Sequence, residues 1–104
     1  MALKIKAYED KLAELCVAYG VQRLEVFGSA TRDDFDPQQS DMDFLVVFED
    51  ARPHGAFDRY FGLKEALERL FERSVDLVEE KAIKNPYFRQ AILRDRMVIY
   101  GTGG

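Results

Sequence analysis

The chain has 104 residues, which suits one small domain and leaves no room for a second domain of ordinary size. Its 15 Lys and Arg against 19 Asp and Glu give a formal charge of −4. This charge argues against a protein whose main task is coating nucleic acid, because clustered basic residues drive that binding. Hydrophobic residues make up 47%, and no apolar run approaches the ~20 residues of a membrane-spanning helix, so we expect a globular protein of the cytoplasm.

A helix and then a strand are predicted first along the chain. Apolar residues recur at three- and four-residue steps over residues 5–19, the period of an amphipathic helix, and Gly20 follows where a helix C-cap belongs. Cys16 lies on the apolar stripe, and we interpret it as a buried small hydrophobic residue rather than as a nucleophile. Residues 22–27 form a short strand, which ends at Gly28.

The remaining elements are predicted from the same periodicities and from turn and cap signals. They are a strand at 41–48, a helix at 57–73, a strand at 74–78, a helix beginning at Asn85-Pro86 and a strand at 97–100. This order predicts an α/β or α+β fold, a sheet with helices packed against it. We expect residues 1–101 to form one domain and residues 102–104 to form a flexible tail.

Several side chains on these elements have both a structural and a functional interpretation. The apolar stripe of the second helix is expected to be core rather than a cofactor contact: Phe57, Tyr60, Phe61, Leu67, Leu70 and Phe71. Its basic outer residues form either a partner contact or, as we favour, a solvated face: Arg59, Lys64, Arg69 and Arg73. The inner face of the third helix is expected to consist of Phe88, Ile92 and Leu93. We interpret the single histidine, His54, as a solvated loop residue.

Two carboxylates stand at the head of the second predicted strand. Asp41 and Asp43 are two residues apart, so both side chains point to the same face. Like charges that close repel unless a divalent cation or solvent relieves them, and oxygen ligands suit Mg²⁺ or Mn²⁺. The pair by itself favours the simpler alternative, a polar strand entry with both acids in water.

Two further features point to phosphate chemistry. Asp76 lies between apolar neighbours in the third predicted strand, where a lone carboxylate is costly unless it reaches a metal, a donor or the sheet edge. Gly28 and Ser29 follow the first strand, and Arg32 comes shortly after, a set of groups that could hold a phosphate. If the second and third strands are neighbours, Asp76 can project towards Asp41 and Asp43. Three such carboxylates beside a phosphate-binding turn would form a two-metal site for nucleotidyl transfer.

In these residues the sequence resembles the minimal nucleotidyltransferases (MNT) of the DNA polymerase beta superfamily. The resemblance rests on Gly28-Ser29-x-x-Arg32, on Ser40-Asp41-Met42-Asp43-Phe44-Leu45-Val46 and on Val75-Asp76-Leu77. It implies a mixed β-sheet flanked by helices, with Mg²⁺ held by Asp41, Asp43 and Asp76 at the catalytic centre. It also implies that the nucleotide triphosphate is bound by Gly28, Ser29, Arg32 and Ser40.

The resemblance also implies a partner. MNT proteins are commonly paired with HEPN-domain proteins in toxin–antitoxin modules, where the MNT protein is the antitoxin and some members transfer AMP from ATP to a tyrosine of the toxin. The alternative is an inactive MNT-fold module that neutralises its partner by stoichiometric binding. Asp33 motivates it, because the family usually has glycine at that position. A nucleic-acid-binding regulator is disfavoured by the acidic net charge.

Overall fold

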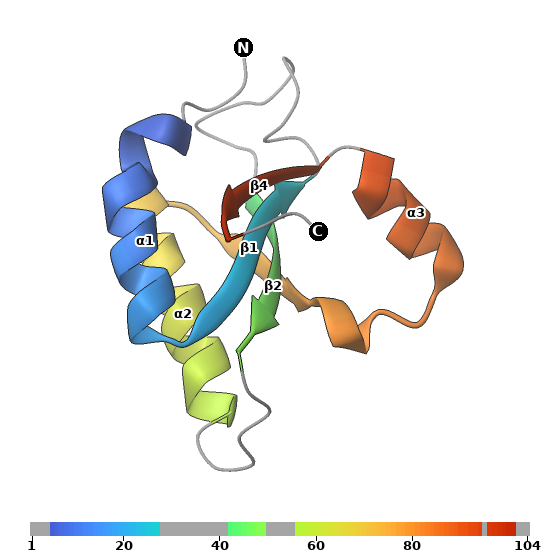
Figure 1. Ribbon diagram of the computed structural model, residues 1–104, viewed down its shortest axis with the longest axis horizontal. Helices are drawn as coiled ribbons and strands as arrows, with labels where there is room; N and C mark the ends of the chain where they lie inside the picture. The colour runs from blue at the N-terminus through green and yellow to red at the C-terminus, as the bar shows by residue number, and fades with distance from the viewer. Residues whose placement is uncertain (1–4, 28–41, 50–55, 95, 102–104) are drawn as a thin grey trace.

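The computed structural model describes residues 5–27, 42–49, 56–94 and 96–101 (Figure 1). In chain order the elements are η1 (Ile5–Tyr8), α1 (Glu9–Ala18), β1 (Val21–Phe27), β2 (Met42–Phe48), α2 (Ala56–Phe71), β3 (Val75–Glu79), η3 (Glu80–Ala82), α3 (Pro86–Arg94) and β4 (Arg96–Tyr100). Every helix and strand predicted from the sequence is present. Among the described residues, η1 replaces the first turn of the helix predicted over residues 5–19, and η3 is additional. Within the described ranges no helix combines the length and the apolar character needed to cross a membrane.

The strands form one mixed sheet in the order β3-β2-β1-β4. β1 runs antiparallel to both β2 and β4, whereas β2 and β3 are parallel. The parallel pair is joined through α2, as a parallel connection requires a crossover element. The predicted mixed sheet flanked by helices is therefore confirmed.

One face of the sheet is covered by α1 and α2, which lie together on that side in Figure 1. Side chains that alternate along the strands point to this face and pack with the helices into the main hydrophobic core. Its buried members are Leu12, Cys16, Val21, Leu24, Val26, Met42, Phe44, Val46, Leu63, Leu67, Phe71, Val75 and Leu77. Cys16 is fully buried, which confirms its interpretation as a small hydrophobic residue. Phe61, which we expected in the core, is instead 44% exposed, and Leu63 is fully buried in the same helix.

The opposite face carries a smaller cluster beneath α3, the helix that stands apart from α1 and α2 in Figure 1. Phe27, Leu45, Ile83 and Ile92 form this cluster, with Val78 packed against it. The inner face predicted for α3 is only partly correct. Ile92 is buried, but Phe88 is 42% exposed and makes an edge contact with the Phe27 ring, with the ring centroids 6.4 Å apart. The side chain of Leu93 lies outside the described ones.

Local signals in the sequence determine where α3 begins. Asn85 Oδ1 accepts hydrogen bonds from the backbone N–H groups of Tyr87 and Phe88, at 2.8 and 3.4 Å. Pro86 then occupies the first helical position, where its missing N–H costs nothing. This is the N-cap arrangement that the Asn-Pro pair predicted.

Candidate active site

Asp43 and Asp76 are brought side by side by the pairing of β2 with β3. Their Cα atoms are register partners in the parallel ladder, and neighbouring strands lie about 4.8 Å apart. Residues two apart in a strand point to the same face. Asp43 therefore shares the face of Leu45, and Asp76 shares the face of Val78, so both carboxylates project to the α3 side of the sheet. Asp76 is exposed and Asp43 is half-buried. The adjacency of the second and third strands, on which the predicted site depends, is therefore present.

The other predicted site residues lie outside the described residues: Gly28, Ser29, Arg32, Ser40 and Asp41. So do Asp33 and His54. Chain connectivity still relates part of this set to the two carboxylates. Phe27, the last residue before Gly28, is the cross-strand partner of Asp43 on β1. Among the residues that the structure does describe, no group of three potential metal ligands comes together.

The carboxylate pair fits the metal implied by the family resemblance. Two carboxylates on one face, at the distance between neighbouring strands, offer only oxygen donors, the ligand type that Mg²⁺ prefers. Their mutual repulsion would be relieved by a cation between them. The exposure of Asp76 leaves the site open on that side to a substrate.

A buried carboxylate that sequence reasoning missed lies on the same face. Glu25, in the middle of β1, is fully buried, and its charge is balanced by two guanidinium groups. Arg23 Nε lies 3.4 Å from Glu25 Oε2. Arg96 Nη1 lies 3.1 Å from Oε1 and 3.3 Å from Oε2, and donates its hydrogen bond to Oε2. Arg23 also forms an ion pair with Glu80, so the chain of charges runs from η3 across β1 to β4.

The sequence held one signal for this network. Glu25 stands between Leu24 and Val26 in a short strand, the same arrangement that drew attention to Asp76. A carboxylate flanked by apolar residues in a strand needs a partner if its face is covered. The arginine partners of Glu25 come from the same strand and from β4, and only the sheet order brings Arg96 beside it.

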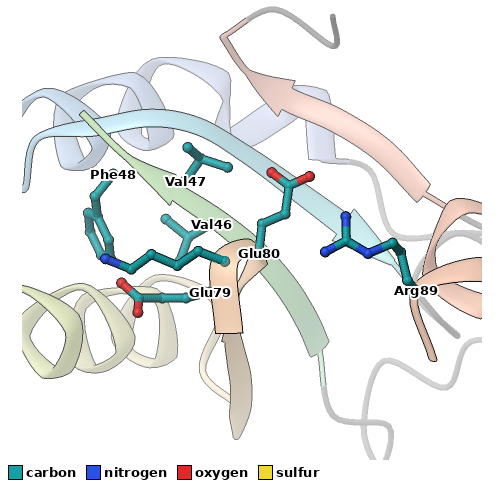
Figure 2. A pocket seen from close by; sticks show the side chains of 7 residues that line it. Val46, Val47, Phe48, Glu79, Glu80 and Arg89 are labelled. Carbon is teal, nitrogen blue, oxygen red and sulfur yellow. The ribbon is translucent and has the colours of Figure 1, made fainter. Parts of the chain in front are cut away.

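A pocket of about 390 Å³ lies at the other end of the same sheet region (Figure 2). Its lining residues come from the ends of β2 and β3, from η3 and from α3: Val46, Val47, Phe48, Glu79, Glu80, Lys81 and Arg89. β2 rises about 3.3 Å per residue, so Val46 to Phe48 lie roughly 10 Å or more along the strand from Asp43. This hollow is therefore separate from the carboxylate pair, and the chemistry of the site follows from the carboxylates and not from the pocket.

The basic residues expected on the outer face of the second helix are largely engaged within the fold. The Arg59 guanidinium lies over the Phe48 ring, 4.3 Å from its centroid, and Lys64 lies 3.8 Å from Glu68. Arg73 Nε donates a hydrogen bond to the Phe71 carbonyl at 3.3 Å. Arg59, Lys64 and Arg73 are therefore only partly exposed, whereas Arg69 is exposed. The choice between a solvated face and a partner contact stays a prediction.

Comparison with known proteins agrees with this geometry. Residues 8–99 match the family model of the nucleotidyltransferase domain. A protein of Methanocaldococcus jannaschii, provisionally named as a protein adenylyltransferase, is 35% identical over 81 residues, which cover 78% of this chain and 79% of the relative. The chain belongs to the nucleotidyltransferase domain family, and within it to the minimal nucleotidyltransferases.

Solved structures show the same fold. One described as a minimal nucleotidyltransferase superposes with a TM-score of 0.73 at 35% identity, over 93% of this chain and 95% of that chain. A second is the complex of a tri-AMPylated HEPN toxin of Shewanella oneidensis with its MNT antitoxin. It superposes with a TM-score of 0.64 at 21% identity, over 94% of this chain and 73% of that chain, so it supports the fold alone.

Proposed function

We propose that this enzyme is a Mg²⁺-dependent protein adenylyltransferase that moves AMP from ATP to a hydroxyl group, with a tyrosine of a HEPN-domain toxin as acceptor. In this function the chain is the antitoxin of the pair. The single observation that carries the proposal is the register of Asp43 against Asp76 on neighbouring strands. The name of the M. jannaschii relative and the AMP-modified HEPN toxin in the S. oneidensis complex support the choice of reaction and partner.

The proposed roles of the residues follow from their chemistry. Asp41, Asp43 and Asp76 would hold the metal, which when bound neutralises charge on the phosphates and activates the attacking oxygen. The triphosphate would be bound by Gly28, Ser29, Arg32 and Ser40. The acceptor oxygen attacks the α-phosphorus, the bond from that phosphorus to the bridging oxygen breaks, and pyrophosphate leaves. Asp76 is the preferred general base, because its carboxylate is exposed to an incoming hydroxyl.

The test is transfer of label from ATP labelled at the α-phosphate to a purified HEPN-domain protein supplied as the acceptor. Asp43→Asn keeps the shape of the side chain but removes its charge, so we expect transfer to fall at least ~100-fold with unchanged thermal stability. Glu49→Gln, an exposed carboxylate at the other end of β2, is the matched control and should transfer normally. Removal of Mg²⁺ with a chelator should also stop transfer. Persistent labelling by Asp43→Asn, by Asp76→Asn and by the double variant would show that these carboxylates are not the catalytic centre.

A second function, stoichiometric neutralisation, is favoured by Asp33 at a position where the family usually has glycine. A carboxylate there would repel a bound triphosphate. Intact-mass spectrometry of the co-expressed partner separates the two functions. AMP increments on the partner support the enzyme. An unmodified partner that is fully neutralised by the Asp43→Asn, Asp76→Asn double variant supports binding alone.

A further inference from the structure

The segment from Lys81, the second residue of η3, to the end of α3 differs in charge from the rest of the molecule. Residues 81–94 contain four basic residues, Lys81, Lys84, Arg89 and Arg94, and no acidic residue, so they carry +4 in a chain whose total is −4. The other residues therefore sum to −8 (−4 minus +4). Lys81, Lys84 and Arg89 are exposed. A concentrated basic surface on an acidic protein favours contact with an acidic partner surface.

The same segment exposes apolar side chains that most helices would bury. Among the described side chains of α3, only Ile92 is buried. Tyr87 is 82% exposed and Phe88 42% exposed. The Asn85 cap bonds the backbone N–H groups of both aromatic residues, which holds this first turn in a helical conformation. Exposed aromatic residues are enriched at the energetic centre of protein–protein interfaces.

The first turn of α3 lies between the candidate active site and the pocket. On one side, Phe88 contacts the ring of Phe27, and Phe27 is the cross-strand neighbour of Asp43. On the other side, Arg89 lines the 390 Å³ pocket, and in Figure 2 its guanidinium points from α3 towards Glu80. A protein that lies along α3 would therefore have its surface both over the pocket and close to the carboxylates.

We propose that Lys81, Lys84, Tyr87 and Phe88, which we call the α3 surface, form the docking site for the protein that receives the nucleotide. The partner would present an acidic surface with apolar side chains to it. This proposal rests on the proposed function, since it places the acceptor of that reaction. A polyanion such as RNA fits less well, because RNA would extend beyond these few basic residues onto a chain whose other residues sum to −8.

The experiment measures the affinity of this chain for the separately purified HEPN-domain protein by titration calorimetry at two salt concentrations. Lys81→Glu combined with Lys84→Glu, and separately Tyr87→Ala, should each weaken binding at least ~30-fold, the scale of an interface hot spot. The side chains changed are exposed, so thermal stability should stay the same. Matched controls on the α1–α2 side are Lys11→Glu combined with Arg69→Glu, and Val17→Ala, where Val17 is 71% exposed. The controls should bind as wild type does.

Each outcome supports or overturns the docking site. Loss of affinity in the α3 variants with retained affinity in Asp43→Asn supports it, as does weaker binding of wild type at higher salt. Unchanged affinity and labelling in the α3 variants would overturn the docking site and leave the proposed enzyme intact. Conversely, α3-dependent binding without label transfer would retain the docking site and reject the enzyme. The docking site is also rejected if wild type does not bind the HEPN protein, if it binds single-stranded RNA more tightly through this surface, or if Tyr87→Ala dissolves a dimer of this chain.

Discussion

At the scale of single residues, Glu25 is the charged residue that is fully buried among the described residues. A fully buried carboxylate in the central region of a sheet is tolerable only when nearby donors balance its charge. Arg23 and Arg96 supply that balance, and their side chains keep 14% and 28% of their exposure. The network joins residues 71 positions apart in the chain, so it stabilises the sheet order as well as the charge.

We predict that Glu25→Gln lowers the free energy of unfolding by about 2 kcal/mol, because two guanidinium groups lose their buried counter-charge. Their partial exposure keeps the loss below the value for a fully buried pair. Urea denaturation measures the difference. Glu14→Gln, on a side chain that is 72% exposed, is the control and should change stability by less than ~0.5 kcal/mol. Equal stability of the two variants would mean that the network contributes nothing.

The thiol of Cys16 yields a second prediction at this scale. Burial raises the pKa of Cys16 from 9.0 to about 12, because the thiolate would lose its hydration in the core. We therefore expect no reaction with a disulfide reagent at pH 8 in the folded protein and full reaction in urea. Above pH 9 the unfolded chain releases this proton and the folded protein does not, so stability should fall as pH rises from about 9 towards 12. Rapid reaction of the folded protein at pH 8 would contradict the buried position.

At the scale of elements, glycines with a positive φ follow α1 and β4. Gly20 joins α1 to β1 with a φ of +66°, and Gly101 ends β4 with a φ of +86°. The two positions differ in the space around them. A Cβ at Gly101 would lie 2.3 Å from the Gln22 carbonyl oxygen and 3.1 Å from the Arg23 Cα, both in the backbone of β1. At Gly20 the nearest atom, Nη1 of the flexible Arg59 side chain, would lie 3.6 Å away.

We predict that Gly101→Ala destabilises the protein by at least ~3 kcal/mol, because it adds a backbone clash to an unfavourable φ and separates β4 from β1. Gly20→Ala should cost only about 1 kcal/mol, since it adds the conformational cost alone. Urea denaturation of both variants tests the difference. Similar losses in the two would show that β4 can move away from β1 without penalty.

At the scale of the whole molecule, the two faces of the sheet are covered unequally. α1 and α2 bury a continuous core with the strands, whereas α3 contributes one buried side chain among those described. Local opening free energies follow buried contacts, so the two halves should differ in stability.

We predict that backbone amides of α3 exchange hydrogen at least ~100-fold faster than those of β1 and β2 when corrected for intrinsic rates. Hydrogen-exchange mass spectrometry of the free chain measures this. Asn85→Ala, which removes the cap, should accelerate α3 further by about tenfold, corresponding to ~1 kcal/mol, and leave β1 unchanged. Equal protection of α3 and β1 would mean that α3 unfolds only with the whole domain.

Much of this organisation could be predicted from the sequence. Hydrophobic period distinguishes helix from strand because it is a local property of neighbouring side chains, so the order of elements was correct throughout. The start of α3 was predictable for the same reason, since Asn85 bonds to residues only two and three positions ahead. Exposure was harder. Phe61 and Phe88 continue apolar stripes but are 44% and 42% exposed, because coverage of a stripe depends on which distant segments pack against it.

The amino-acid sequence by itself indicated the elements of this enzyme, its family and the acidic residues that we propose for its chemistry. Only the tertiary structure decided that β3 lies parallel beside β2 with Asp76 opposite Asp43, and that Arg96 lies beside Glu25. The physical reason is that the face to which a strand residue points follows from its neighbours in the chain, whereas the identity of the next strand depends on contacts between distant segments. Strands pair where side chains from distant segments pack into one core, and the local sequence pattern of a strand does not specify its neighbour.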